Sequence, residues 1–153
     1  MTIFPWQKKK EFFKPEEKNT IVEAIRFSEK RTSGEIRVFV ESRCRYVDAI
    51  DRAAEIFFSL EMERTDDRNA VLVYVAMKDR QLAIFGDENI HRKVGNEYWN
   101  NTVTKILSSF NRENYAAGLR QCVTDVGEAL HYYFPYDKDT DKNELPDDIV
   151  FGK

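Results

Sequence analysis

The run Ala70–Ala76 constrains the fold more than any other stretch of this sequence. It consists of seven consecutive apolar residues rich in β-forming side chains. An uninterrupted run of this kind predicts a central strand covered on both faces. Alternating apolar residues at about 36–42 predict a second strand, and helical spacing at about 47–62 predicts a helix between the two. The order strand, helix, strand implies a right-handed crossover with both strands parallel.

The other predicted elements complete one α/β domain. A short turn at 77–80 leads into a strand at 81–85, which returns antiparallel to the central strand. Apolar residues at helical spacing predict a helix that begins at Pro15, a helix around Trp99–Phe110 and a longer helix over Tyr115–Tyr133. The fold class predicted from these elements is a three-layer α/β/α sandwich around a small mixed β-sheet.

The predicted domain has less ordered segments at both ends. We expect a flexible N-terminal arm at 1–12, a single domain at 13–135, and an acidic, partly mobile C-terminal tail at 136–153. In the tail, residues 137–148 resemble the start of an EF-hand loop, but Lys142 stands where that loop requires glycine. The tail is therefore interpreted as a solvated acidic segment.

Charge and composition exclude several classes of function. The chain has 24 basic and 27 acidic residues and a net charge of −3, so no broad positive field for nucleic acid is expected. No apolar stretch approaches the roughly 20 residues that span a bilayer, and the first residues lack the apolar core of a signal peptide. With only Cys44 and Cys122 present, we expect reduced thiols and a cytoplasmic location.

The predicted topology gathers acidic residues at one edge of the sheet. Glu35 precedes the first strand, Asp66 and Asp67 precede the central strand, and Asp87 and Glu88 follow the returning strand. Parallel strands start at the same edge, and an antiparallel strand ends there. Carboxylates without thiolates or clustered imidazoles favour Ca²⁺ or Mg²⁺. The sequence therefore suggests a divalent-cation site, which we name the acidic rim.

Two alternatives compete with a metal site at the acidic rim. Arg68 can pair with Glu35 or Asp87, and loop carboxylates are commonly just solvated. Open α/β sheets also usually bind ligands at the opposite edge, where the parallel strands end. That rule points to residues 41–43 and 78–79, which form no obvious constellation in the sequence.

Two further residues near the rim carry specific expectations. Gly34 follows a predicted helix and is expected to take the left-handed backbone that helix ends favour. His91 lies beside the rim, where a general acid or base is conceivable, and a plain surface histidine is the alternative.

Several segments together resemble the TPM domain family, which includes thylakoid-lumen proteins involved in photosystem II repair and many bacterial proteins. The similarity rests on TSGEIRV at 32–38, on Thr65 with the segment RNAVLVY at 68–74, and on Gly86-Asp87 and Trp99. It extends to FKPEE at 13–17, to Phe134-Pro135 and to Glu144-Leu145-Pro146, so it covers nearly the whole chain after residue 11. The family usually has glycine where this chain has Ala70, and often where it has Asn89.

The resemblance implies a Rossmann-like α/β/α sandwich. Some family members are reported to bind Ca²⁺ at loop carboxylates, and a plant member is described as an acid phosphatase. Carried over by position, the implied metal-loop residues are Gly34, Glu35, Asp67 and Asp87, with Asp66 and Glu88 as additions.

Three functions remain open from the sequence. The first is an accessory or binding domain whose rim holds a divalent cation, Ca²⁺ before Mg²⁺. The second is a metal-dependent acid phosphatase acting on phosphomonoesters, although the sequence shows no evident nucleophile or base. The third is an interaction module that uses the N-terminal aromatic residues to contact a protein partner. Whether the chain is an enzyme is left undecided.

Overall fold

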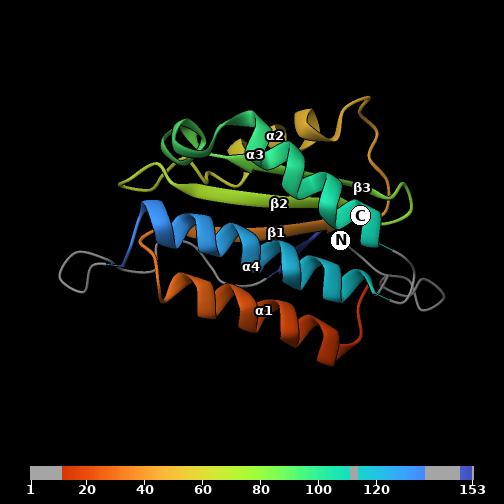
Figure 1. Cartoon of the computed structure of the whole chain (residues 1–153). Helices are drawn as coiled ribbons and strands as arrows, with labels where there is room; N and C mark the ends of the chain where they lie inside the picture. The colour runs from red at the N-terminus through yellow and green to blue at the C-terminus, as the bar shows by residue number, and fades with distance from the viewer. Residues whose placement is uncertain (1–11, 111–113, 137–148, 153) are drawn as a thin grey trace.

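The computed structural model describes residues 12–110, 114–136 and 149–152, and it shows a mixed four-stranded sheet between helices (Figure 1). The order across the sheet is β3-β2-β1-β4. Strand β1 pairs in parallel with β2 and with β4, whereas β3 is antiparallel to β2. The strands are β1 (Glu35–Glu41), β2 (Ala70–Ala76), β3 (Gln81–Gly86) and β4 (Ile149–Phe151).

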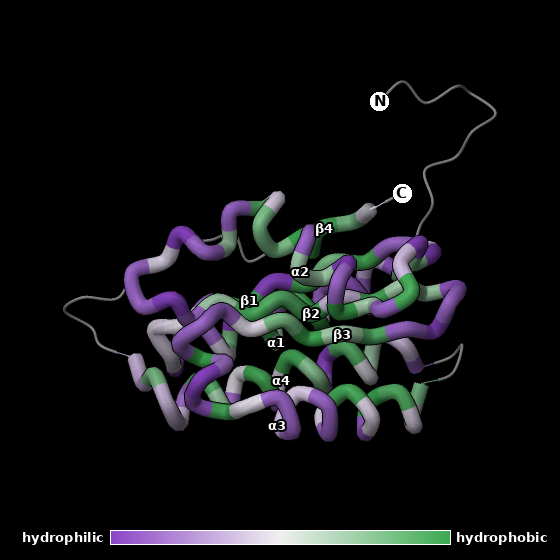
Figure 2. The backbone as a smooth tube through the Cα atoms, turned by 90° about the horizontal axis from the view of Figure 1, so that it is seen from above, coloured by the Kyte–Doolittle hydropathy of each residue, from purple (hydrophilic) through white to green (hydrophobic). Residues whose placement is uncertain are grey.

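Helices cover both faces of this sheet, so the predicted three-layer α/β/α class is confirmed. Viewed from above, α2 lies on one side of the strands, and α3 and α4 lie on the other (Figure 2). Helix α1 packs against α4 and joins their layer. The helices are α1 (Pro15–Glu29), α2 (Ala49–Ser59), α3 (Glu88–Ser109) and α4 (Tyr115–Tyr133).

Strand β2 is the centre of the domain, as the sequence predicts. All seven of its residues are buried, because β1 and β3 flank it and helices cover both its faces. Alternate side chains of the strands enter two separate cores. Val38 and Val73 pack with the α1, α3 and α4 layer, whereas Phe39 and Tyr74 pack with α2.

The backbone at Gly34 differs from the expectation. The only glycine with positive φ among the described residues is Gly95, so Gly34 is not left-handed. A Cβ atom built on Gly34 would instead lie 2.7 Å from Cδ2 of Leu130 in α4. The prediction was therefore wrong about the reason for this glycine, which is required by close packing of α4 against the start of β1.

Helix α3 is longer than predicted, because it begins at Glu88 and not near Trp99. Its two parts meet at Gly95, where φ is 80° and ψ is 166°. Glycine tolerates this backbone, which interrupts the helix and separates its first turns from the segment around Trp99.

The C-terminal end contributes a strand that the sequence analysis does not include. In β4, Ile149 lies opposite Val38 of β1. The ring of Phe12 stacks on Phe151 at a centroid distance of 6.0 Å, so both ends of the described chain meet at this side of the sheet. The EF-hand-like segment 137–148 lies outside the described residues. Among those that are described, no helix is long and apolar enough to cross a membrane.

Candidate functional site

The register of the strands brings the two ends of the predicted acidic rim together. Glu35 lies opposite Ala70 in the parallel pair, and the backbone N–H of Asp87 donates to the carbonyl of Ala70 at 2.8 Å. Glu35 and Asp87 therefore flank the first residue of β2. The predicted juxtaposition of these sequence-distant acids at one sheet edge is confirmed.

The carboxylate of Asp87 is committed to an ion pair. Nε of Arg68 donates to Asp87 Oδ2 at 2.7 Å, and Nη2 donates to Oδ1 at 2.9 Å. Oδ1 also accepts from the backbone N–H of Glu88 at 2.8 Å and caps α3. The bond to Asp87 raises the pKa of the Arg68 guanidinium. Arg68 thus provides the positive charge that a metal ion would otherwise provide here.

The loop that carries Asp66 and Asp67 is held to its neighbours by amide side chains. Nδ2 of Asn69 donates to Oγ of Ser33 at 3.0 Å, and Nδ2 of Asn89 donates to the carbonyl of Asp67 at 2.8 Å. Two oxygen atoms of this loop, Thr65 Oγ1 and Asn69 Oδ1, are buried and make no hydrogen bond within the described residues. The loop is ordered, and it contains oxygen atoms that an additional ligand could satisfy.

The predicted metal-loop residues do not form a ready-made cage. Glu35 is buried and 2% exposed, whereas Asp66, Asp67 and Glu88 are exposed. Glu88 also lies 3.4 Å from Nη1 of Arg68. Within the part of the chain that the structure describes, no three carboxylate, imidazole or thiol groups are arranged to hold a metal ion.

A cavity of about 650 Å³ opens beside the acidic rim. Arg68, Asp87 and His91 line one part of it. The indole N–H of Trp99 donates to Nδ1 of His91 at 3.0 Å, so a neutral His91 ring carries its proton on Nε2. His91 is therefore an oriented side chain beside the rim and not a freely rotating surface histidine.

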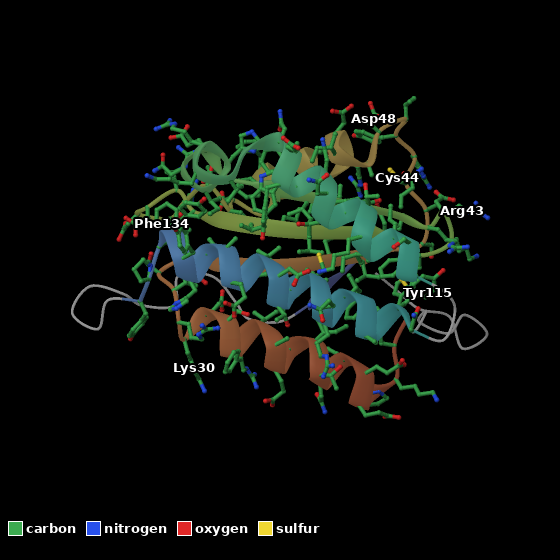
Figure 3. The ribbon with its side chains drawn as sticks, viewed as in Figure 1. Lys30, Arg43, Cys44, Asp48, Tyr115 and Phe134 are labelled. Atoms are coloured by element: carbon green, nitrogen blue, oxygen red, sulfur yellow. The ribbon has the colours of Figure 1, made fainter. Side chains whose placement is uncertain are left out.

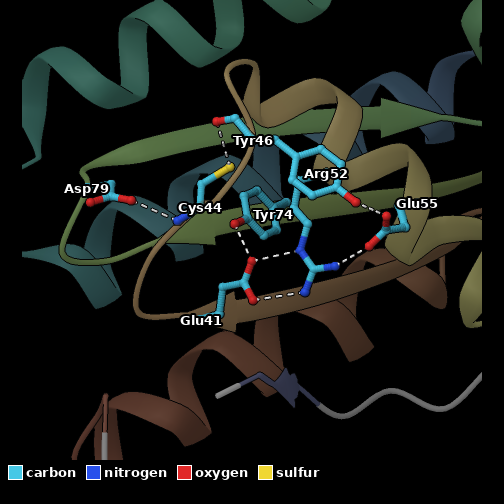
Figure 4. Close-up of polar contacts among 7 residues, drawn as sticks. All are labelled: Glu41, Cys44, Tyr46, Arg52, Glu55, Tyr74 and Asp79. Atoms are coloured by element: carbon cyan, nitrogen blue, oxygen red, sulfur yellow. Dashed lines mark hydrogen bonds and ion pairs between the residues drawn. The ribbon is translucent and has the colours of Figure 1, made fainter.

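At the other end of the parallel strands, where β1 and β2 finish, lies a polar network that was not predicted from the sequence. Arg43 and Cys44 lie at this end of the molecule, far from Phe134, whose carbonyl accepts from Ser33 N beside the rim (Figure 3). Glu41 ends β1 here. Its carboxylate accepts from Nε and Nη2 of Arg52 at 2.9 and 3.0 Å, and from the hydroxyl of Tyr74 at 2.5 Å (Figure 4).

This Glu41 network extends to the surface. Nη1 of Arg52 and the hydroxyl of Tyr46 both donate to the carboxylate of Glu55. Burial, with the hydrogen bond to Glu41, raises the pKa of Tyr74, and the bond to Glu41 also raises the pKa of Arg52. Tyr74 therefore stays neutral and Arg52 stays charged across the physiological range.

A second cavity, of about 720 Å³, is lined in part by Glu41, Tyr46 and Arg52 of this network. Its lining includes Arg43, whose Nη1 lies 3.2 Å from Oδ1 of Asp79. The residues at 41–43 and 78–79 that the strand-end rule indicated do come together here. Arg52 and Tyr74 could not be identified as their partners from the sequence, because Arg52 lies within a helical pattern and Tyr74 lies within an apolar strand. The β1–α2–β2 crossover was the one feature of the sequence that could have predicted this network, because it places α2 beside the carboxyl end of β1.

Comparison with known proteins identifies the family of this chain. The TPM domain family model, labelled TPM phosphatase, matches residues 7–129. The chain therefore belongs to the TPM domain family.

A solved structure supports the same conclusion. The NMR structure of BA42 protein from the psychrophilic bacterium Bizionia argentinensis is 42% identical in sequence, with a TM-score of 0.84. The match covers 95% of this chain and 99% of the BA42 chain. No curated protein sequence gives a significant match.

Proposed function

We propose that the acidic rim binds a divalent cation, Ca²⁺ in the first place and Mg²⁺ as the alternative. The observation that supports this proposal most is the convergence of loops 65–69 and 86–89 on the start of β1, with Asp66, Asp67 and Glu88 exposed in these loops. Acidic oxygens at one edge repel each other unless positive charge lies among them, and a divalent cation would add to the charge that Arg68 supplies. Family membership adds weight, because the resemblance implies metal binding at these loops.

A cation bound at these residues would compete with Arg68. Asp87 and Glu88 already contact the guanidinium, so metal binding at these carboxylates must displace or rearrange it. The carboxylates of Asp66, Asp67 and Glu88 would supply hard oxygen ligands, and Asn69 Oδ1 offers a buried neutral oxygen. In this proposal the bound cation organises the loops, and the domain has an accessory or binding role in the cytoplasm.

Calorimetric titration of the purified chain with CaCl₂ tests this competition. Replacing Arg68 with Gln removes the competing charge and should tighten Ca²⁺ binding by about tenfold, because a unit charge a few ångströms away contributes on the order of 1–4 kcal/mol. Asp67→Asn should weaken binding, and Ca²⁺ should raise the melting temperature with concentration.

Asp79→Asn is the matched control for the titration. Asp79 is an ion-paired acid at the opposite edge of the sheet, so its replacement should leave Ca²⁺ affinity unchanged. If Arg68→Gln binds no more tightly than the original chain, and Asp67→Asn binds equally well, then no cation is bound at the rim.

A metal-dependent acid phosphatase is the second candidate, and the cavity beside the rim is the observation that favours it. Arg68 and His91 both line that cavity, where a guanidinium can bind a phosphate and an oriented imidazole can transfer a proton. A bound divalent cation would polarise a phosphoryl oxygen. Hydrolysis of p-nitrophenyl phosphate should then be lost in Asp87→Asn. Turnover that survives both Asp87→Asn and Glu35→Ala would exclude the rim as the catalytic site.

A further inference from the structure

Strand β3 is the outermost strand on one side of the sheet in the described part of the chain, so one row of its backbone groups has no neighbouring strand there. Opposite residues in an antiparallel pair of strands alternate between pairs that exchange backbone hydrogen bonds and pairs that do not. Asp87 N donates to Ala70 O, so Ala70 and Asp87 form a hydrogen-bonded pair, as does every second pair along β2 and β3. The N–H and C=O groups of Leu82, Ile84 and Gly86 therefore point away from β2. Leu82 and Ile84 are only 5% and 2% exposed, so an added strand must displace the side chains that cover these groups. In the described part of the chain, no strand lies on that outer side.

The 650 Å³ cavity is a groove that follows this outer edge. All five residues from Leu82 to Gly86 line it. Helix α2 supplies the lining residues of one wall, and helix α3 supplies those of the other. In the α2 wall, Ile50 is 45% exposed and Phe58 is 51% exposed. Apolar walls beside unpaired backbone groups are the features of a site that accepts an added strand.

The α2 and α3 walls make a single extended segment a better occupant of the groove than a second copy of this domain. A second copy that paired through its own β3 would bring its own α2 and α3 against these helices. A single extended segment avoids that contact, and its alternate side chains can meet the two walls in turn.

The charges around the groove indicate the chemistry of the segment. Asp48 lies at one end of the groove, and Asp87 and Glu88 lie at the other, where Arg68 is already bonded to Asp87. We propose that the β3 edge binds an extended peptide segment of a partner protein, apolar at alternate residues and basic at its ends, as a fifth strand. This inference uses Asp87 and Glu88, which the proposed cation site also uses, so peptide binding is measured without added Ca²⁺.

Binding of a synthetic peptide to the ¹⁵N-labelled full chain tests the proposal. The probe is the acetylated and amidated heptapeptide with the sequence Lys-Val-Thr-Val-Thr-Val-Lys. Hydrogen exchange at the amides of Leu82, Ile84 and Gly86 should slow by about tenfold or more in its presence. Peptides N-methylated at alternate residues provide a sharper test. Methylation in one register should abolish binding, and methylation in the other register should not.

Two variants of similarly exposed residues distinguish specific peptide binding in the groove from non-specific binding to exposed apolar side chains. Phe58→Gln should weaken peptide binding by about tenfold, since exposed apolar anchors dominate such contacts. Phe27→Gln, at a residue 61% exposed on α1, should leave it unchanged. Equal losses in both variants, equal binding of a peptide with Glu at both ends, or equal binding of both N-methylated peptides would overturn the proposal. Protection of the β3 amides without peptide that rises with protein concentration would overturn it in favour of a dimer.

Discussion

At the scale of single residues, the Glu41–Arg52 pair shows how burial changes the value of an ion pair. The Glu41 side chain is 7% exposed and the Arg52 side chain 25% exposed. Arg52→Met should destabilise the domain by about 2–4 kcal/mol, because it leaves a buried carboxylate with only the Tyr74 hydroxyl as a hydrogen-bond partner among the described residues. Urea denaturation measures the change.

Arg43→Met is the control for that measurement. The Arg43 side chain is 68% exposed, so loss of its pair with Asp79 should cost less than about 1 kcal/mol. Equal effects of the two replacements would contradict the distinction. The double variant Glu41→Gln with Arg52→Met should recover part of the lost stability.

Burial of the Cys122 thiol predicts that the free energy of unfolding falls at alkaline pH. Burial raises the pKa of Cys122 from 9.0 to about 12. The native state holds the neutral thiol, so its contribution to stability is complete below pH 9 and is lost as pH rises towards 12. Between these values, the original chain should lose about 1.4 kcal/mol per pH unit relative to Cys122→Ala. Parallel slopes of the two unfolding free energies against pH would contradict this.

At the scale of secondary-structure elements, α1 and α4 approach too closely for a side chain at Gly127. A Cβ atom there would lie 2.6 Å from Cβ of Ser28. Gly127→Ala should therefore destabilise the domain by about 1–3 kcal/mol, although Ala favours a free helix by about 1 kcal/mol. Combining it with Ser28→Gly should restore stability beyond the sum of the single effects, as measured by thermal or urea unfolding. Additive losses would show that the helices do not meet at these residues.

Elements whose pattern is local could be predicted from the sequence. The run Ala70–Ala76 and the stripe of α4 specify their own structure through burial and periodicity. The three-residue strand β4 could not be predicted, because so short a strand depends on β1, more than 100 residues away. The first turns of α3 were missed because Gly95 interrupts the apolar pattern.

At the scale of the whole molecule, chain topology allowed the positions of the rim carboxylates to be predicted, but not their side-chain partners. Strand direction alone places Glu35 and Asp87 beside Ala70. Sequence could name Arg68 as a partner but could not choose between Glu35 and Asp87, since that choice depends on side-chain geometry. The Glu41 network lay beyond reach because its members come from β1, α2 and β2.

The central claim is that the acidic rim binds a divalent cation, and a Ca²⁺ titration followed by backbone amide NMR tests it most directly. Saturable shifts confined to residues 33–36, 65–69 and 86–90 are predicted, with larger changes at lower Ca²⁺ concentration in Arg68→Gln. Absence of saturable shifts, or shifts confined to 137–148, would contradict the proposed site.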